Sequence, residues 1–250
     1  MSTFNLSVII PAYDELVNLQ KGVLEKVEHF LSKQKYTSEV VIVDDGSTDG
    51  TIEYVEKFTS ENPRFKLIKN SHVGKAGAVT AGMLAAKGKY VLFADMDQAT
   101  PIEEIEKLLP VLEEGYDIAV GSRGVIRKGS PLSRKIISIG LIIMRKAIVG
   151  ISDVSDTNCG FKAFKHDVAQ KLFKKIYDLN GGFKQISGSA VKAGFDVELL
   201  FVAEKMGYKI KEVPVNWLYV ETRRVSPLRD SIDGVEDLIR IRINDLQHKY

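Results

Sequence analysis

Two pairs of carboxylates follow two apolar segments of the sequence. Asp95 and Asp97 lie directly after residues 90–94, and Asp44 and Asp45 follow an earlier apolar segment. In extended backbone, residues two apart point to the same side, so Asp95 and Asp97 can share a ligand. Carboxylate oxygens suit Mg²⁺ and Mn²⁺, and such cations are often shared with substrate phosphates. The pattern therefore predicts a site for a nucleotide diphosphate and a divalent metal.

Alternating apolar and amphipathic segments indicate the elements that position these carboxylates. Strands are predicted at residues 6–11, 39–43, 65–68, 90–94 and 118–121, and helices at 18–32, 50–58, 77–86 and 103–113. This alternation favours an α/β fold with a mostly parallel sheet over residues 1–125. Ligands of such sheets bind beyond the carboxyl ends of the strands, where both acidic pairs stand.

The composition limits the class of protein. The chain has 250 residues, of which 44% are hydrophobic, and a net charge of +2, which suits one large domain and gives no support for nucleic-acid binding. A single cysteine, Cys159, excludes an internal disulfide and favours a reducing compartment. We find no signal-peptide pattern and no apolar window long enough to span a membrane. The expectation is a cytoplasmic protein, peripheral at the cytoplasmic face of a membrane.

The second half of the chain contains an apolar segment flanked by basic residues. Helices are predicted at 133–149, at 195–206 and from 226 onward, with a strand at 210–215. The part at 136–149 is too short and too charged to span a bilayer. With Arg134, Lys135, Arg145 and Lys146 it can lie in the membrane interface, assisted by the basic C-terminal stretch. A buried core helix or a dimer face is the alternative.

Seven short motifs occur in one order along the chain. They read VIIPAYDE at 8–15, VDDGSTDGT at 43–51, GKAGAV at 74–79, ADMD at 94–97, GSR at 121–123, DTNCGFK at 156–162 and FDVELL at 195–200. The ordered set resembles the inverting nucleotide-sugar glycosyltransferases of family 2, and among them the dolichyl-phosphate glucosyl- and mannosyltransferases. The resemblance implies a GT-A fold, a Rossmann-like, mostly parallel sheet flanked by helices, with a C-terminal acceptor-side extension. Residues 1–125 would be the nucleotide-sugar-binding half and 126–250 the acceptor-binding half of the same domain.

The activity that the resemblance implies is hexose transfer with inversion. The donor would be a nucleotide sugar, with UDP-glucose favoured over GDP-mannose, and the acceptor a polyprenyl phosphate. Mg²⁺ or Mn²⁺ would assist the departure of the diphosphate. Many relatives carry transmembrane helices that this sequence lacks. The expected partners are the donor, the lipid phosphate and a membrane surface, while the oligomeric state is left open.

Roles on the donor side follow from the matched motifs. Asp97 would hold the metal, and Asp95 the metal or the ribose, while Asp44 or Asp45 would bond the nucleobase or ribose. Lys75 stands at a predicted helix N-terminus, where backbone N–H groups and its ammonium can meet the donor phosphates. The remaining donor contacts are assigned to Pro11, Ala12, Tyr13, Glu15 and Met96.

Roles on the acceptor side depend on cations and one carboxylate. Arg123, Arg134 or Lys135, and Arg223 are the candidates for the acceptor phosphate, because arginine binds phosphate at two points. Asp156 is expected beside the reacting centre. A phosphate acceptor is already anionic, so positioning and charge balance would matter more than a strong base.

Other residues have weaker claims to a functional role. Asp196 and Glu198 do not share a helix face, so at most one of them points into the site. Cys159 is expected to be buried and inert, and Trp217 to belong to the core. Three other functions stay open: transfer to a soluble or polysaccharide acceptor, nucleotide-sugar binding without catalysis, and nucleotidyl transfer.

Overall fold

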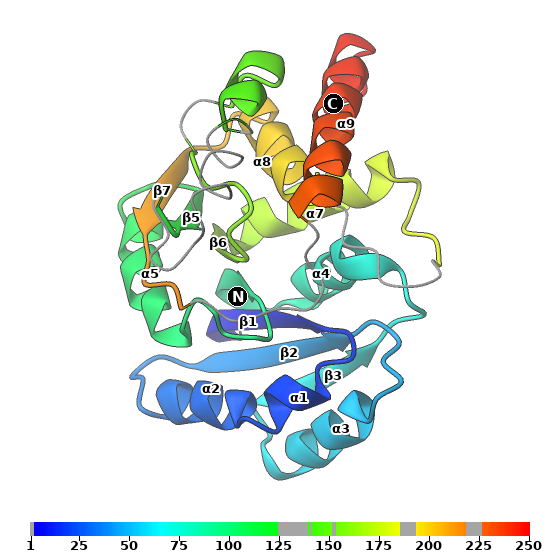
Figure 1. The fold of residues 1–250 in the computed structure, drawn as a ribbon. Helices are drawn as coiled ribbons and strands as arrows, with labels where there is room; N and C mark the ends of the chain where they lie inside the picture. The colour runs from blue at the N-terminus through cyan, green and yellow to red at the C-terminus, as the bar shows by residue number, and fades with distance from the viewer. Residues whose placement is uncertain (1–2, 125–139, 141, 152–153, 186–193, 219–226) are drawn as a thin grey trace.

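The computed structural model describes residues 3–124, 140, 142–151, 154–185, 194–218 and 227–250 (Figure 1). Within these residues, one seven-stranded sheet has the order β3-β2-β1-β4-β6-β5-β7. The strands are β1 (Phe4–Ala12), β2 (Ser38–Asp44), β3 (Phe65–Lys69), β4 (Gly88–Ala94), β5 (Ile118–Ser122), β6 (Phe161–Lys165) and β7 (Ile210–Pro214).

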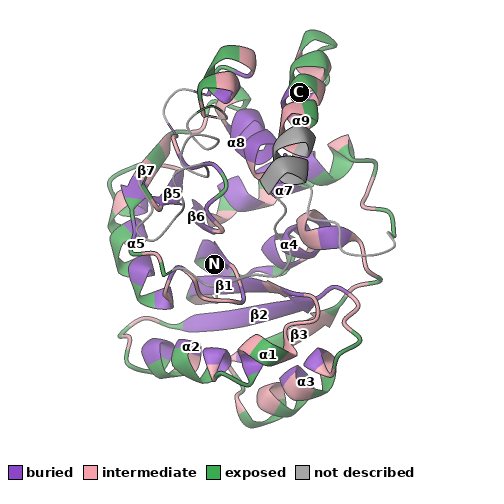
Figure 2. Ribbon diagram, viewed as in Figure 1, coloured by how far each residue is buried: buried purple, intermediate pink, exposed green. Residues whose placement is uncertain are grey.

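Helices cover both faces of the sheet. They are α1 (Leu16–Leu19), α2 (Val23–Ser32), α3 (Thr51–Glu61), α4 (Gly74–Ala85), α5 (Ile105–Glu113), α7 (His166–Leu179), α8 (Phe195–Lys205) and α9 (Pro227–Leu246), and residues 142–148 are also helical. In Figure 1, α1, α2 and α3 lie below the sheet, and α4, α7, α8 and α9 lie above it. The inner strands are mostly buried, whereas the edge strands β3 and β7 are partly exposed (Figure 2).

The alternation of side chains along β1 explains this three-layer arrangement. Ile9 points into the core beneath α4 and α7, whereas Val8 and Ile10 point into the core beneath α2 and α5. All three side chains are fully buried. Both faces of the strand are therefore apolar, as expected for a parallel strand that helices cover on both sides.

Most neighbouring strands run parallel, which confirms the predicted fold class. β1 is parallel to β2 and β4, β2 to β3, and β5 to β7, whereas β6 is antiparallel to both of its neighbours. Strand β6 and helix α7 were not predicted. The segment Phe161–Lys165 has lysines three residues apart, at 162 and 165, so it lacks the strict apolar alternation of a strand, and Lys162 is fully buried although it is charged. Because β6 lies between β4 and β5, the two halves of the chain share one sheet.

One predicted helix is divided in two. The single helix expected at 18–32 is interrupted between α1 and α2, where Gly22 has a φ of +75°. This left-handed conformation is accessible to glycine at little cost and ends the first helical segment. The break turns the chain so that α2 can pack against the sheet with Leu24 and Val27 buried.

Glu39 fixes the amino-terminal end of the sheet and makes stability depend on pH. Its carboxylate accepts from Ser7 Oγ at 2.7 Å, the Lys87 N–H at 2.8 Å and Lys66 Nζ at 2.8 Å, and the residue is 1% exposed. Burial alone would raise the pKa of Glu39, but these donors outweigh it and lower the pKa. The carboxylate therefore stabilises the fold above its unfolded pKa of about 4.3, and this contribution is lost as the pH falls through the lower folded value.

We expect Glu39→Gln to reduce the free energy of unfolding at neutral pH by about 1–3 kcal/mol, because the buried donors lose a charged acceptor. The difference from the unsubstituted chain should shrink as the pH falls below about 4. Urea denaturation at neutral pH and at a pH below about 4 measures this difference in the free energy of unfolding. A deficit that stays constant between the two would contradict the charge argument.

Candidate active site

The carboxylates that follow β4 line a small pocket at the carboxyl edge of the sheet. The N–H of Asp95 donates to the carbonyl of Gly160 at 3.1 Å, and Asp97 Oδ1 accepts from the N–H of Ala99 at 3.0 Å. The pocket is lined by Asp95, Asp97, Ala99, Thr100, Arg123, Cys159, Gly160 and Trp217. Candidates that are far apart in the sequence, including Asp97 and Arg123, thus meet at one place.

Gly160 permits the close approach of two segments at this pocket. A Cβ at position 160 would lie 1.9 Å from Asp95 Oδ2, which is closer than any two such atoms can come. Only a residue without a side chain lets the Asp95 carboxylate lie against the turn that leads into β6. The glycine of the DTNCGFK motif therefore has a steric explanation.

Lys75 reaches the pocket from the first turn of α4. Its Nζ lies 2.7 Å from Asp95 Oδ1 and 5.3 Å from the centre of the Phe93 ring. Burial alone would lower the pKa of Lys75, but the charges of Asp95 and Asp196 outweigh it and hold the pKa above its usual range. Lys75 is thus a fixed cation beside the carboxylates, on the side where donor phosphates were predicted.

The pocket suits a hard divalent cation. Burial raises the pKa of Asp97, and the neighbouring charge of Asp95 adds to this rise, which the hydrogen bond from Ala99 does not cancel. Within the described part of the chain, no group of three or more His, Cys, Asp or Glu side chains could hold a metal. Two carboxylates at one pocket still fit Mg²⁺ or Mn²⁺, which complete their ligand shells with phosphate oxygens and water. Asp95 and Asp97 would hold the cation.

Replacing Lys75 by methionine should separate metal binding from donor binding. Without the ammonium on Asp95 Oδ1, we expect Mn²⁺ alone to bind more tightly by about threefold to tenfold, because an ammonium and a cation compete for one carboxylate. The affinity for a nucleoside diphosphate should fall by about tenfold. Isothermal titration calorimetry measures both, with Lys174→Met on the exposed face of α7 as the control. Equal changes in both affinities would contradict this competition.

Arg123, which lines the pocket, forms a two-point ion pair with Asp156. Arg123 Nε donates to Oδ2 at 2.7 Å, Nη2 donates to Oδ1 at 2.6 Å, and the backbone N–H of Arg123 donates to Oδ2 at 3.0 Å. Asp156 is 8% exposed. Burial would lower the pKa of Arg123, but the hydrogen bonds and charge of Asp156 raise it. The pair fixes a permanent cation at the pocket and leaves Asp156 poorly suited to act as a base.

The two carboxylates after β2 have different surroundings. Asp45 accepts from the N–H groups of Val73 and Gly74 at 2.8 and 2.7 Å, so it caps the start of α4. Asp44 Oδ1 accepts from two backbone N–H groups of the following turn, whereas Asp44 Oδ2 is buried without a hydrogen-bond partner among the described residues. Of the predicted pair, Asp44 keeps one carboxylate oxygen without a donor among the described residues, while Asp45 orders the helix that carries Lys75.

His72 is a residue that the sequence did not single out. Its ring stacks on Tyr13, with the ring centres 4.4 Å apart and an angle of 18° between the planes. Its Nδ1 lies 2.7 Å from the carbonyl oxygen of Asp45. The stacked pair therefore stands beside the acidic turn, where the sequence predicted that Tyr13 would meet the base. No motif includes His72, because its role depends on the fold of a loop.

The other predicted donor contacts shape this region through the backbone. The Ala12 carbonyl accepts from the N–H of Asp45 at 2.8 Å, and Pro11 pairs in register with Val43. Glu15 accepts from the Asn18 side chain, and its own N–H donates to Thr51. Met96 is 2% exposed and packs in the core beneath α2 and α5, so its side chain is directed away from the pocket.

Three acceptor-side candidates lie outside the described residues, namely Arg134, Lys135 and Arg223. Arg145 is described, and its predicted place at a membrane interface is wrong. Its side chain is 6% exposed and turned inward, where Nη1 donates to Thr157 Oγ1 at 2.7 Å. The neighbouring Lys146 is exposed. Burial of the guanidinium follows from its bonds to the loop that contains Asp156.

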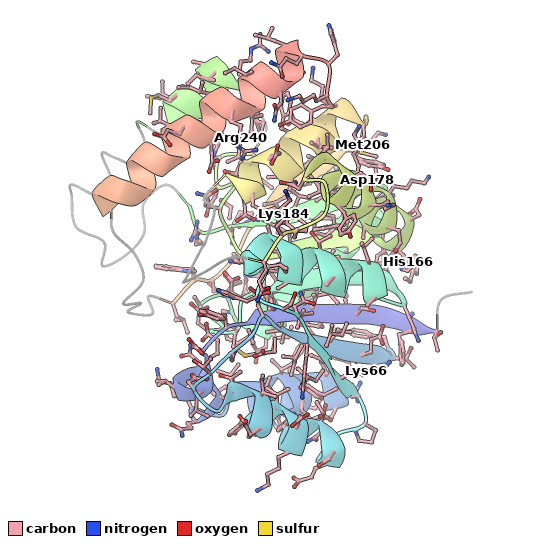
Figure 3. All side chains as sticks on the ribbon, turned by 90° about the vertical axis from the view of Figure 1, so that its right-hand side faces the viewer. Lys66, His166, Asp178, Lys184, Met206 and Arg240 are labelled. Atoms are coloured by element: carbon pink, nitrogen blue, oxygen red, sulfur yellow. The ribbon has the colours of Figure 1, made fainter. Side chains whose placement is uncertain are left out.

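Asp196 and Glu198 point to different partners, as their spacing predicts. Asp196 accepts from Lys162 Nζ beneath the pocket. Glu198 instead accepts from Arg240, which Figure 3 labels on α9. Cys159 is 1% exposed, and burial raises the pKa of its thiol to about 11, so the expectation of an inert thiol is supported. The prediction that Trp217 belongs to the core is wrong, because this partly exposed residue lines the pocket.

Solved structures share this architecture. The chain superimposes on mannosyl-3-phosphoglycerate synthase from Rubrobacter xylanophilus with a TM-score of 0.68 and 14% identity, covering 99% of this chain and 76% of that one. A mannosyltransferase from Pyrobaculum calidifontis in complex with GDP-Man and Mn²⁺ gives a TM-score of 0.60 and 18% identity, covering 98% and 74%. The fold is therefore that of the GT-A glycosyltransferases.

Sequence comparison then identifies the family. Residues 7–173 match the model of glycosyl transferase family 2, to which this chain belongs. A dolichyl-phosphate beta-glucosyltransferase of Dictyostelium discoideum is 33% identical over 96% of this chain and 75% of its own length. The proteins of the same name from Saccharomyces cerevisiae and Homo sapiens are 34% and 31% identical, over 95% and 98% of this chain and 74% and 76% of their own lengths. The predicted resemblance is thus confirmed, and the chain is a glycosyltransferase.

Proposed function

We propose that this glycosyltransferase moves glucose from UDP-glucose to a polyprenyl phosphate such as dolichyl phosphate, with inversion and with Mg²⁺ or Mn²⁺. The observation that supports it best is the pocket where Asp95 and Asp97 face the Arg123–Asp156 pair. The carboxylates that would bind the metal of the donor diphosphate then lie next to a fixed arginine that would bind the acceptor phosphate. The relatives named above are dolichyl-phosphate beta-glucosyltransferases, which favours glucose and this lipid acceptor.

The donor would lie between the acidic turn and the pocket. The turn that begins at Asp44 and Asp45 would meet the uracil or the ribose, and Tyr13 would pack on the base. The diphosphate would lie beside Lys75, whose ammonium balances its charge. A divalent cation on Asp95 and Asp97 would supply further neutralisation of the leaving diphosphate. In this proposal, residues 1–125 bind the donor and residues 126–250 bind the acceptor.

The reaction requires positioning more than proton transfer. A phosphate oxygen of the acceptor attacks C1 of glucose as the bond from C1 to the UDP oxygen breaks, so the products are glucosyl phosphate lipid and UDP. The attacking oxygen is already anionic, and no base is needed. Arg123 would hold the acceptor phosphate opposite the leaving group, and Asp156 would keep the guanidinium oriented. Fixed charges of this kind stabilise the transition state without reorganisation.

A lipid acceptor requires contact with a membrane surface. We propose that the chain binds peripherally to the cytoplasmic face of a membrane. No helix in the described part of the chain is long and apolar enough to span a bilayer. Ile239, Ile243 and Leu246 are 48%, 47% and 65% exposed at helical spacing along α9, and Ile143 is 62% exposed. These side chains favour an apolar contact. Co-sedimentation with anionic vesicles tests this contact. A variant of the chain with serine in place of Ile239, Ile243 and Leu246 should remain in the supernatant.

The test of the function is label transfer in detergent. Radiolabelled UDP-glucose and GDP-mannose are each incubated with dolichyl phosphate, with Mn²⁺, Mg²⁺ or EDTA. We expect label from UDP-glucose in the organic phase only when metal is present. Transfer from GDP-mannose instead would overturn the choice of donor. Hydrolysis of UDP-glucose without lipid product would point to a soluble acceptor, and no reaction of either donor would overturn the proposal.

A further inference from the structure

The carboxylate that holds Arg123 is carried by a turn, not by a helix or strand. Asp156 lies in the stretch 154–160, which leads into β6 without forming a regular element. A turn that depended on its own backbone would not fix a side chain to within a few tenths of an ångström. The Arg123–Asp156 pair is nevertheless bonded at two points, so other groups must hold the turn in place.

Glu212 on β7 holds one side of the turn. Its carboxylate accepts from the Ser155 N–H at 3.0 Å, from Ser155 Oγ at 2.7 Å and from the Asp156 N–H at 2.9 Å. Burial alone would raise the pKa of Glu212, but these donors outweigh it and lower the pKa. Glu212 pairs in register with Val120 on β5, the strand that Arg123 follows. The same sheet register therefore sets the position of Arg123 and of the group that holds Asp156.

Arg145 holds the other side of the turn from the helix at 142–148. Its Nη2 donates to the carbonyls of Val154 and Ser155 at 2.8 and 3.0 Å, and its Nη1 donates to Thr157 Oγ1. The buried guanidinium thus bonds the residues on both sides of Asp156 without touching its carboxylate in these contacts. Nη1 and Nη2 of this buried guanidinium find acceptors in the turn, whereas Nε has none among the described residues, so these two nitrogens and the turn hold each other.

We propose that Arg145 and Glu212 are positioning residues for glycosyl transfer, which clamp the turn so that Asp156 holds Arg123 in the pocket. Neither residue lines the pocket. Their effect on turnover is transmitted through the turn and the ion pair. The inference rests on the proposed function, because it assigns these residues a role at the same site.

The test compares kcat and KM in two conservative variants, Glu212→Gln and Arg145→Lys. We expect kcat to fall by about tenfold to a hundredfold, an effect typical of residues that orient a functional group. The KM for UDP-glucose and the affinity for Mn²⁺ should stay within about twofold, because Asp95, Asp97 and Lys75 are untouched. Glu39→Gln is the matched control: it also removes the charge of a buried, multiply bonded glutamate on a strand, but at the other end of the sheet, and kcat should not change.

The outcomes separate this inference from the proposed function. If the unsubstituted chain transfers no glucose, the proposed function fails. If it is active and both variants keep their kcat, or lose it only in proportion to the fraction folded, the inference fails. Crystal structures of the variants give a readout that needs no turnover. The Arg123–Asp156 pair should be displaced or broken in Glu212→Gln, and an unmoved pair would overturn the clamp.

Discussion

Asp97→Asn should reduce glycosyl transfer by a factor on the order of a thousand while the protein stays folded. The substitution keeps the size of the side chain and an oxygen that can accept from the Ala99 N–H. It removes one of the two carboxylate charges that line the pocket. Burial already raises the pKa of Asp97, so losing this charge costs the fold nothing and mainly removes the attraction for a cation.

Initial rates at saturating donor and calorimetric titration with Mn²⁺ measure this effect. The metal affinity should fall together with the rate, and the melting temperature should not decrease. Asp178→Asn is the control, because the side chain of this exposed residue on α7 accepts from Lys174 and lies outside the pocket. Full activity of Asp97→Asn in the presence of EDTA would mean that the pocket needs no metal, and would contradict the role assigned to Asp95 and Asp97.

Lys162→Met should destabilise the fold by about 3–5 kcal/mol, which is the cost of breaking a buried ion pair. Lys162 is fully buried on β6, and its Nζ donates to the Cys159 carbonyl at 2.7 Å and to Asp196 on α8. Methionine fills a similar volume but leaves the carbonyl without this donor. It also leaves the Asp196 carboxylate, whose side chain is 14% exposed, without its nearest cation.

Urea denaturation of a double-mutant cycle measures this pair. Adding Asp196→Asn to Lys162→Met should recover at least half of the lost stability, because the uncompensated charge is then gone. Lys174→Met, which breaks an exposed pair on α7, should cost less than about 1 kcal/mol. A loss for Lys162→Met as small as that of this control would show that the buried pair contributes little.

The meeting of Asp95, Asp97 and Arg123 at one pocket could be expected from the sequence, because these residues follow strands of one sheet. Asp95 and Arg123 each come directly after a strand, Asp44 ends β2, and ligand sites of such sheets lie at the carboxyl ends of parallel strands. The apolar segments before them were recognisable by composition. Their convergence therefore needed only the fold class, not the details of packing.

The remaining parts of the site depend on contacts that a linear pattern does not encode. Nothing in the sequence indicates that Asp156 pairs with Arg123, or that Glu212 holds the turn that carries Asp156. Arg145 has the spacing of an interfacial cation, yet tertiary hydrogen bonds turn it inward. Lys162 illustrates the same limit, because a lysine in a short strand is normally taken as solvent-exposed.

The antiparallel strand β6 bears on how the protein assembles during synthesis. β4 and β5 come from the first half of the chain, but their neighbouring edges both pair with β6, which is made about forty residues after β5. Until then one edge of β4 and both edges of β5 lack partners in the nascent chain, and unpaired strand edges invite association with other chains. A fragment ending near residue 125 should therefore aggregate, and the pocket cannot close before the ribosome has released Trp217.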